Sequence, residues 1–539
     1  MTAGSAARIG VNVSWMTPGQ VGGMEWYVRN LIAELGAIDR HHEYLLVTSP
    51  QNDRTFGVPS PRWRKLIYDG PESSPQSYIG LPAPPPLRRR VRAFLGRMRR
   101  RLRAGFVSWW RGDLASLLRE QGIDLWFCPF MYMVPVDTDV PVVVTIPDLQ
   151  HEAFPGFFGE QETAFRTLGY QYSCQRAAAV IGISRWVADD IVKRYAVNPG
   201  KVFGIPLGLD PSYAVLPEVV ARITSDVRLK YRLDYDFLLY PANGWHHKNH
   251  ESLAAALVRL REQGRDIRLV LTGSDFGVTD RLRDMLGGRQ LARAVRHLGY
   301  VERADLVGLY SAAQALVFPS LFEGFGLPLL EAMQLGTPVV CSRAGSLPEV
   351  GGAAAAYVDP LDPADIARVV ARVLDDKPYR DSLVTAGHER VQAFSFRRTA
   401  EETHAVFARV LAGDLGRPPL PPCRPLIPNH WLRDGQGVWY FHADSLRQVE
   451  LDFVQPIRAP ELAGQRLTVD LDGQASVDVL IEPERPYHLT VTATAPTPGG
   501  FHRLEVRSTR RMARRHQVLS AQVAGITTVH GDGRRVKLV

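Results

Sequence analysis

The stretch from Phe318 to Thr337, FPSLFEGFGLPLLEAMQLGT, constrains the fold more than any other part of the chain. The segment ALVFPS that leads into it is a short apolar run, typical of a buried strand in a parallel sheet. Pro328 suits the first position of a helix, where its missing N–H costs nothing, and Gly336 suits the residue just past the helix end. The pattern predicts a strand, a glycine-bearing loop and a helix in immediate succession.

Two glutamates lie in this unit, Glu323 in the loop and Glu331 eight residues later, which the pattern places in the first helical turn. The free N–H groups of a helix start form a site for an anionic phosphate. Carboxylates are good acceptors for the hydroxyl groups of sugars. Because both carboxylates would face a ligand lying over the phosphate site, the unit indicates a nucleotide sugar. An ordinary acid that favours the helix dipole is the alternative for Glu331.

Strand and helix signals alternate along most of the chain, which predicts an α/β fold with parallel sheets. The pattern restarts near residue 235, so we expect two doubly wound, Rossmann-like domains, at 1–208 and 209–412, that face a ligand cleft. Residues 50–87, rich in Pro, Ser and Arg, are interpreted as loop. The helix from Ser395 to Gly413, with Ser395 as its N-cap, is expected to pack back across the hinge. The predicted strands are ARIGVNVSW, EYLLVTS, IDLWFCPF, VPVVVTIPD, RAAAVIGIS, KVFGIPLG, DFLLYPA, IRLVLTGS, AVRHLGYV, ALVFPS, TPVVCS and AAAAYVDP.

The character of the chain changes after residue 412. Residues 413–428 contain the run GRPPLPPCRPLIP, which is typical of a semi-rigid Pro-rich linker. Residues 429–539 hold short alternating segments such as RLTVDLDG, ASVDVLIEP and QVAGITTV, separated by turn residues. This pattern predicts an all-β, sandwich-like accessory domain.

The four cysteines are scattered and form no CxxC pair, so neither a zinc site nor a disulfide framework is indicated. A reducing cytoplasm is the simplest setting. The N-terminus lacks the apolar core of a signal peptide, and no run of about 18 apolar residues predicts a transmembrane helix. Composition thus favours a cytoplasmic protein.

The net charge of +8 is concentrated in the segment Arg88 to Trp110, which begins RRRVRAFLGRMRRRLR. Apolar residues recur there at helical spacing, and Phe106, Trp109 and Trp110 extend the apolar side. A basic amphipathic helix with aromatic anchors fits an anionic membrane surface, which predicts a peripheral location at the inner face of the membrane. A solvated basic helix is the alternative. Nucleic acid binding is disfavoured because no recognised module surrounds the patch.

The segment from Leu321 to Ala367, LFEGFGLPLLEAMQLGTPVVCSRAGSLPEVGGAAAAYVDPLDPADIA, resembles the donor-binding core of retaining glycosyltransferases with the two-Rossmann GT-B fold. More narrowly, it is similar to the large fourth family of those enzymes, which includes many mannosyl- and rhamnosyltransferases. Supporting matches are YPANGWHHKNHESL, LVLTGS, HLGYV and PDLQHEAFP, so the resemblance covers about residues 9 to 412. The β-domain lies outside it.

The resemblance implies roles for the residues of the glycine loop. Glu331 would bind the nucleotide ribose, and Glu323 would lie near the transferred sugar. The backbone of the loop would contact sugar and phosphate, through Gly324, Phe325, Gly326 and Leu327.

Lys248, in NGWHHKNH, matches the family's lysine that neutralises the diphosphate. A fixed cation there would stabilise the leaving group more in the transition state than in the ground state. The family often has an arginine five residues earlier, where this chain has Asn243, an asparagine that some mannosyltransferase-like members share. The alternative for Lys248 is a solvated surface lysine.

Asp148 and His151 lie in PDLQHEAFP, at the carboxyl end of a strand of the first domain. Many family members have a histidine directly before this aspartate, where it contacts the donor sugar, whereas this chain has Pro147. His151 is a candidate for an acceptor-side catalytic role, and a structural histidine is the equal alternative.

Further donor-binding residues are implied by the same resemblance. Gly22 and Gly23 open the first helix of the first domain, where a glycine pair lets the backbone approach a phosphate or an acceptor; a plain tight turn is the alternative. Tyr300 and Val301 match the family's backbone contact to the nucleobase. Gly273 ends another strand that faces the same cleft.

The sequence therefore predicts a retaining, metal-independent hexosyltransferase that needs no cofactor. The donor is a nucleoside-diphosphate sugar, with GDP-mannose as first choice and UDP- or dTDP-sugars left open. The acceptor is a glycan or lipid-linked molecule of cell-surface polysaccharide synthesis. The histidines of HHKNH are not expected to bind a metal. The alternatives are a catalytically inactive glycan-binding or scaffold protein and a nucleotide-dependent oxidoreductase, which the missing G-x-G-x-x-G fingerprint disfavours.

Overall fold

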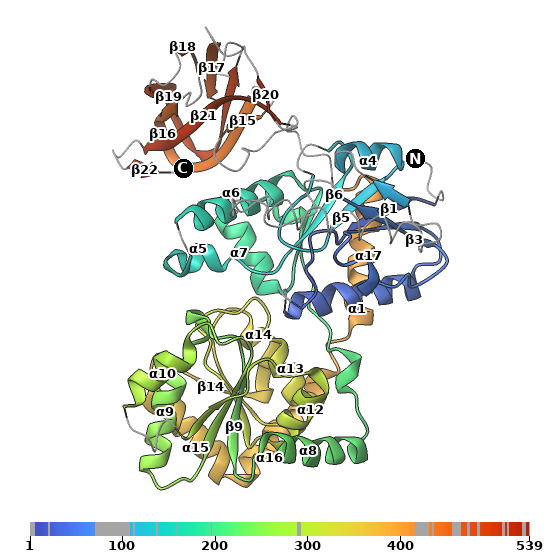
Figure 1. Cartoon of the computed structure of the whole chain (residues 1–539), viewed down its shortest axis with the longest axis vertical. Helices are drawn as coiled ribbons and strands as arrows, with labels where there is room; N and C mark the ends of the chain where they lie inside the picture. The colour runs from blue at the N-terminus through green and yellow to red at the C-terminus, as the bar shows by residue number, and fades with distance from the viewer. Residues whose placement is uncertain are drawn as a thin grey trace, which may run out of the picture.

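The computed structural model describes residues 6–19, 22–69, 108–110, 114–135, 138–158, 160–195, 197–287 and 293–415, together with separate strands between 431 and 537. Two α/β units come first along the chain, and Figure 1 shows each as a sheet with helices packed on its faces. This confirms two Rossmann-like domains with parallel sheets.

The first sheet has eight strands in the order β4-β3-β2-β1-β5-β6-β7-β8, all paired in parallel. Its central strands are buried because both faces are covered, which explains their continuous apolar runs. The strands are β1 (Arg8–Asn12), β2 (Glu43–Thr48), β3 (Trp63–Tyr68), β4 (Ser108–Trp110), β5 (Leu125–Cys128), β6 (Val142–Ile146), β7 (Ala179–Gly182) and β8 (Val202–Gly204). The helices are α1 (Gly23–Ile38), α4 (Leu114–Glu120), α5 (Gln150–Ala153), α6 (Glu160–Arg176) and α7 (Arg185–Tyr195).

The second sheet has six parallel strands in the order β11-β10-β9-β12-β13-β14. Its strands are β9 (Phe237–Pro241), β10 (Arg268–Thr272), β11 (Val295–His297), β12 (Ala315–Phe318), β13 (Val339–Ser342) and β14 (Ala355–Val358). The helices are α8 (Pro217–Tyr231), α9 (His250–Glu262), α10 (Val278–Leu286), α12 (Arg303–Ala312), α13 (Leu327–Gln334), α14 (Leu347–Gly351), α15 (Pro363–Asp375) and α16 (Lys377–Val391).

The order of the strands reverses between β9 and β12, which are neighbours in the second sheet. Ligands of open α/β sheets bind outside the carboxyl ends of the strands at such a switch point. The loop after β9 carries Lys248 and the loop after β12 carries Glu323. The topology therefore places both predicted donor-binding loops where a ligand is expected.

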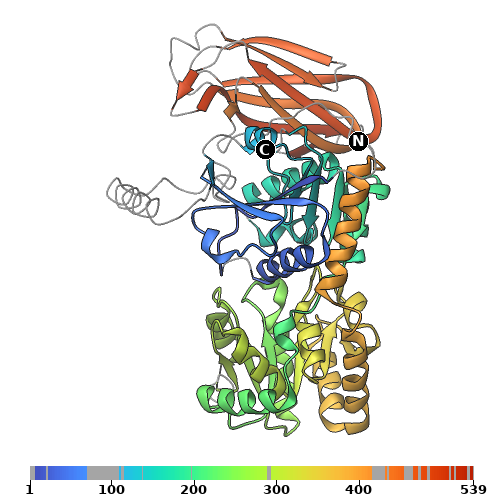
Figure 2. The ribbon, with the colours of Figure 1, turned by 90° about the vertical axis from the view of Figure 1, so that its right-hand side faces the viewer.

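Helix α17 (Phe396–Ala412) returns from the second domain to the first, as the sequence predicts. Ser395 caps it, since its hydroxyl accepts a bond from the N–H of Arg398 at 3.2 Å, and a bridge to Leu209 ties this point to the segment that joins the domains. The helix packs against α1, β5 and β7. Figure 2 shows it running along the side of the first domain.

The described strands beyond residue 430 pair antiparallel in one sheet of eight strands. They are β15 (Trp431–Arg433), β16 (Gln436–Val454), β17 (Gln465–Leu471), β18 (Ala475–Ile481), β19 (Pro486–Ser508), β20 (Met512–Arg514), β21 (Gln517–His530) and β22 (Arg535–Lys537). The sandwich-like domain stays a prediction, and the Pro-rich linker from residue 416 onwards lies outside the described residues.

Two expectations about the first domain need correction. Residues 50–87 are not all loop, because β3 lies among them and pairs in parallel with β2. Trp109 and Trp110 do not extend a helix, because they belong to β4, which pairs with β3. The basic part of the segment, residues 88–107, lies outside the described residues. Within the described part of the chain, no helix is long and apolar enough to cross a membrane.

Candidate donor site between the two domains

An ion pair between Lys248 and Glu323 lies at the switch point. The Lys248 ammonium is 2.6 Å from the Glu323 carboxylate, and the two side chains are 14% and 11% exposed. The loop after β9 is fixed by the hydroxyl of Tyr240, which donates to the carbonyl of Lys248 at 2.6 Å. Asn249, in the left-handed conformation, donates to the carbonyl of Pro319 and joins the two loops. Lys248 and Glu323, which the sequence analysis assigns to one donor site, are thus neighbours in the structure, and their binding role stays a prediction.

The glycine loop after β12 is fixed by hydrogen bonds to Ser346, which precedes α14. Ser346 donates to the carbonyls of Phe325 at 2.8 Å and Glu323 at 3.1 Å. Gly326 has a φ of 108° and precedes α13, so a side chain at this position would be strained. The loop residues Gly324 to Gly326 lead directly into the helix, which begins at Leu327.

Glu331 is the fifth residue of α13, so it lies in the second turn and not in the first turn that the sequence pattern suggested. The helix begins at Leu327, one residue earlier than expected. The Glu331 carboxylate accepts a bond from the hydroxyl of Tyr310 at 2.6 Å. Burial raises the pKa of Glu331 above its ordinary value, and the Tyr310 hydroxyl and the Arg303 charge oppose that shift. A partly buried carboxylate held in this way is suited to accept bonds from a diol.

The first domain contacts this loop at close range. A Cβ atom on Gly324 would overlap the carbonyl oxygen of Pro147, and one on Gly23 would lie 3.2 Å from the side chain of Leu327. Ser184, which is fully buried, donates to the carbonyl of Gly324 at 2.9 Å. The loop that resembles a donor site is therefore shaped by both domains.

Asp148 follows β6 and lies beside this contact. Its carboxylate accepts the N–H of Gln150 at 2.9 Å. Burial raises the pKa of Asp148, and the charges of Glu323 and Lys248 both act on it. The structure thus places Asp148 near the ion pair of the second domain, and its predicted catalytic role stays a prediction.

His151 is placed differently from its predicted role. Its side chain is 1% exposed, a ring nitrogen bonds the hydroxyl of Tyr195 at 3.1 Å, and its ring packs on Tyr170. Burial lowers the pKa of His151 to about 3, helped by the charges of Arg166 and Arg194. These contacts are with the core of the first domain, so the structure favours the structural alternative over a catalytic role.

The remaining predicted donor residues lie at neighbouring strand ends. Asn243 accepts the N–H of Ser274 at 2.8 Å, so it joins the loops after β9 and β10. Gly273 has a φ of 110° and donates to the carbonyl of Gly299 at 2.8 Å, which joins the loops after β10 and β11. Tyr300 is 77% exposed and Val301 is buried. Gly22 has a φ of 60° and precedes α1, which confirms that a glycine pair opens that helix.

A contact between the domains at the start of α7 was not predicted from the sequence. The N–H groups of Arg185 and Trp186 both donate to the carboxylate of Glu349, at 3.0 Å each. Ser184 accepts the N–H of Val187 at 3.0 Å and so caps the same helix. A serine before an apolar helical pattern is a recognisable cap signal, but its partner in another domain leaves no local signal.

Among the described residues, one group of side chains has the composition and spacing of a metal site: Asp39, His42 and His404. It includes none of the histidines of HHKNH. The prediction that the transfer reaction needs no metal is not tested by it.

Comparison with known proteins identifies both α/β domains. Residues 21–213 match the family model of Glycosyltransferase Family 4, and residues 223–390 match that of Glycosyl transferases group 1. The chain contains a glycosyltransferase family 4 domain and a group 1 glycosyltransferase domain. Neither match reaches the strands beyond residue 430.

Two curated relatives of these glycosyltransferase domains are mannosyltransferases. The O-antigen chain mannosyltransferase B of Escherichia coli is 29% identical over 263 residues, which are 48% of this chain and 68% of the relative. The MMP alpha-(1->4)-mannosyltransferase of Mycolicibacterium hassiacum is 32% identical over 244 residues, which are 43% of this chain and 54% of the relative. This chain therefore spans about half to two thirds of the relatives' length.

Solved structures share the fold of the two glycosyltransferase domains. Sucrose-phosphate synthase from Thermosynechococcus elongatus has a TM-score of 0.55 at 23% identity, covering 76% of this chain and 100% of that one. Anabaena HepE, in a complex with UDP and glucose, has a TM-score of 0.53 at 15% identity, covering 75% and 99%. At these identities the likeness establishes the fold of two Rossmann-like domains and nothing finer.

Proposed function

We propose that this protein is a retaining glycosyltransferase that moves a hexosyl group, with mannose as first choice, from a nucleoside-diphosphate sugar to a glycan or lipid-linked acceptor. The observation that carries the proposal is the Lys248–Glu323 ion pair, 2.6 Å long, at the switch point of the second sheet. The relatives named as mannosyltransferases support mannose. GDP-mannose is the proposed donor.

In this proposal each charged group has one partner in the donor. Lys248 neutralises the diphosphate, whose charge grows as the glycosidic bond breaks, so its stabilisation is greater in the transition state. Glu323 accepts hydroxyls of the transferred sugar. Glu331 accepts hydroxyls of the ribose, and Tyr310 holds its carboxylate in place through a 2.6 Å bond.

The acceptor approaches from the first domain, where Pro147 and Asp148 meet the glycine loop. We propose attack on the same face of the sugar from which the diphosphate leaves, with a donor phosphate oxygen taking the proton of the acceptor hydroxyl. Lys248 supplies the positive charge at the leaving group, which is why we propose transfer without a metal. Because Asn243 bonds the neighbouring loop, it acts here as a structural link and not as a substitute for the family's arginine.

The first experiment is a thermal-shift screen with GDP, UDP, dTDP and their sugars, on the wild type and on Glu331→Ala. A ligand that binds only the folded state raises its apparent stability by about 2.7 kcal/mol at a concentration 100 times its dissociation constant. We expect a shift with guanine nucleotides that Glu331→Ala loses. Glu262→Ala, an exposed acid at the end of α9, is the matched control and should keep the shift.

A transfer assay with radiolabelled GDP-mannose and a mixture of glycan acceptors then separates an enzyme from a scaffold. Label moved to acceptor, or slow release of free mannose, supports the enzyme. Nucleotide binding without either reaction favours an inactive glycan-binding or scaffold protein. A thermal shift seen only with UDP or dTDP ligands would show that the donor carries that nucleotide and not GDP.

The basic segment Arg88 to Trp110 motivates a lipid-linked acceptor at an anionic membrane. Its residues 88–107 lie outside the described residues, so the proposal rests on their sequence. Changing Arg99, Arg100 and Arg101 to Glu should release the protein from anionic vesicles in a sedimentation assay, because about 1 kcal/mol of attraction is lost for each basic residue near the surface. Equal sedimentation of wild type and variant would refute the membrane contact.

A further inference from the structure

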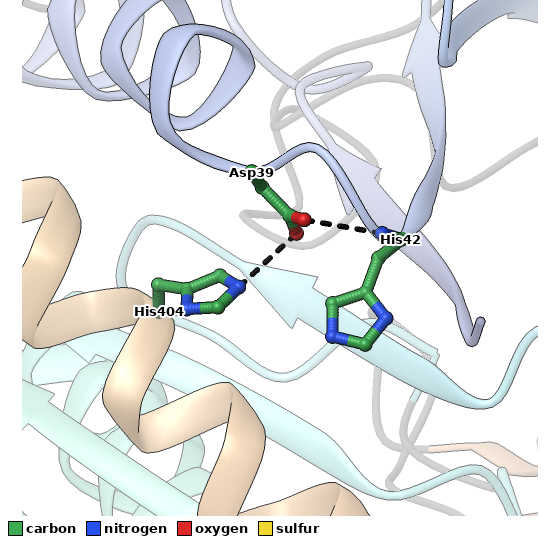
Figure 3. A group of neighbouring side chains, drawn as sticks. All are labelled: Asp39, His42 and His404. Atoms are coloured by element: carbon green, nitrogen blue, oxygen red, sulfur yellow. Dashed lines mark hydrogen bonds and ion pairs between the residues drawn. The ribbon is translucent and has the colours of Figure 1, made fainter. Parts of the chain in front are cut away.

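Three side chains with metal-binding atoms meet where α17 crosses the first domain. Asp39 follows the end of α1, His42 lies in the turn before β2, and His404 lies on α17. One nitrogen or oxygen atom from each lies within 4.8 Å of the others. Figure 3 shows the three side chains gathered at this point from two segments, the turn between α1 and β2 and the helix α17.

The Asp39 carboxylate is held in a fixed orientation. One oxygen accepts the backbone N–H groups of His41 and His42, at 2.8 and 3.1 Å. The other accepts the hydroxyl of Tyr44 at 2.7 Å and lies 3.1 Å from a ring nitrogen of His404. Asp39 is 4% exposed, and its ion-pair partner among the described residues is His404, not a lysine or arginine. A buried carboxylate of this kind favours a cation beside it.

We propose that Asp39, His42 and His404 bind a divalent transition-metal ion, with zinc as the first candidate. Two imidazoles and one carboxylate form a ligand set that zinc accepts, and a water molecule would complete four-coordination. Ligands about 2.0 to 2.1 Å from one tetrahedral zinc ion lie about 3.3 Å apart. The 3.1 Å between the Asp39 oxygen and the His404 nitrogen therefore suits two ligands of one ion.

The surroundings prepare these groups for a metal. The Asp39 carboxylate accepts hydrogen bonds from Tyr44 and from two backbone N–H groups, which hold it in place for a metal ion. Tyr44 and the two N–H groups would remain as second-shell partners that orient the carboxylate. Ligation has one cost, because a ring nitrogen of His42 now accepts the N–H of Ala7 at 3.2 Å, and that long bond would be disturbed.

Such an ion would fasten α17 to the first domain. The helix starts at Ser395, beside the segment that joins the domains, and reaches the first domain through α1. An ion bound by both His404 and Asp39 would hold α17 against the first domain more firmly than their present hydrogen bond does. The site shares no residue with the Lys248–Glu323 pair, so it can fail or succeed independently of the transferase proposal.

The test uses the full chain after treatment with a chelator, in thermal unfolding with and without one equivalent of zinc chloride. We expect zinc to raise the midpoint by about 3 to 8 °C. His404→Gln and His42→Gln should abolish the rise, because a glutamine amide is a poor zinc ligand. The amide at position 404 can still donate to Asp39, which preserves the present hydrogen bond. His388→Gln, an exposed histidine on α16, is the matched control and should retain it. Cobalt(II) should give the visible absorption of a four-coordinate ion in wild type and control only.

The results distinguish zinc bound at Asp39, His42 and His404 from zinc bound elsewhere in the protein. A zinc-dependent rise lost in the two cluster variants and kept in the control supports the metal site. No rise and no cobalt absorption in the wild type would overturn it. A rise that persists in the His42→Gln/His404→Gln double variant would also overturn it, because the ion would then bind elsewhere, for example at the histidines of HHKNH. The midpoints without zinc show whether each variant is folded.

Discussion

Breaking the Lys248–Glu323 ion pair should change the affinity for a nucleoside diphosphate differently from the affinity for a nucleotide sugar. In the free protein the two charges are 2.6 Å apart and mostly shielded, with 14% and 11% of the side chains exposed. A charge-assisted hydrogen bond contributes about 1.5 to 3 kcal/mol, and removing one partner leaves the other charge unpaired. We therefore expect Glu323→Gln and Lys248→Met each to lower the free energy of unfolding by about 2 kcal/mol.

A bound diphosphate changes this balance, because it becomes the partner of Lys248 and repels Glu323. Two unit charges about 5 Å apart interact by about 3 kcal/mol at an effective dielectric constant of 20. Glu323→Gln should therefore bind GDP more tightly than wild type, by about 1 to 2 kcal/mol after screening. With GDP-mannose the gain should vanish, because the carboxylate that accepts the sugar hydroxyls is gone. Lys248→Met should lose affinity for both ligands.

Isothermal titration calorimetry with GDP and GDP-mannose, combined with urea unfolding, measures all of these quantities on the two single variants and the double variant. Asp280→Asn is the control. The side chains of Asp280 and Arg283 are 75% and 64% exposed, so their ion pair should contribute less than about 1 kcal/mol to the free energy of unfolding. The reasoning is refuted if Glu323→Gln weakens GDP binding as much as Lys248→Met does. It is refuted equally if the double-mutant cycle shows no coupling in the free protein.

Three further outcomes are expected. Glu349→Ala removes the carboxylate that accepts two N–H groups at the start of α7, at 3.0 Å each. The free energy of separating the two domains should fall by about 1 to 2 kcal/mol. Small-angle scattering should then show a larger radius of gyration. Burial lowers the pKa of His151 from 6.5 to about 3 on folding, so the unfolded chain binds more protons than the folded chain between pH 6.5 and 3. The free energy of unfolding should therefore fall as the pH drops below 6.5. His151→Phe should reduce this dependence of the melting temperature on pH. Ser395→Ala should cost about 1 kcal/mol in urea unfolding, since the N-cap of α17 is lost.

The sheets of both glycosyltransferase domains were predictable because their strands are buried on both faces. Continuous apolar runs such as VVVTI at β6 and RLVLT at β10 mark such strands without any knowledge of their neighbours. The strand β3 escaped prediction because Arg64 and Lys65 interrupt its apolar pattern, while the rest of the strand is buried at the sheet.

The candidate site was predictable only within each domain. The loops that carry Lys248 and Glu323 follow buried strands at a switch point, so their proximity follows from topology. The role of His151 was not predictable, because burial against Tyr170 and Tyr195 depends on helices α6 and α7 that pack around it. Glu349 contacts two residues of α7 that lie 164 and 163 positions away in the sequence, and no periodic pattern encodes such a pair.

The contacts between the domains have a consequence for donor selection. Gly324 lies against the carbonyl of Pro147, and Ser184 donates to the carbonyl of Gly324, so the first domain fixes the backbone of the loop that is proposed to hold the sugar. A donor that orders this loop must also favour the arrangement in which the domains touch, since the same atoms serve both purposes. By thermodynamic linkage, if the proposed donor tightens the domain contact by some factor, the domain contact tightens donor binding by the same factor, so Ser184→Ala should lower donor affinity by at most that factor. In the proposed transferase, donor affinity would therefore depend on the first domain as well as on the second.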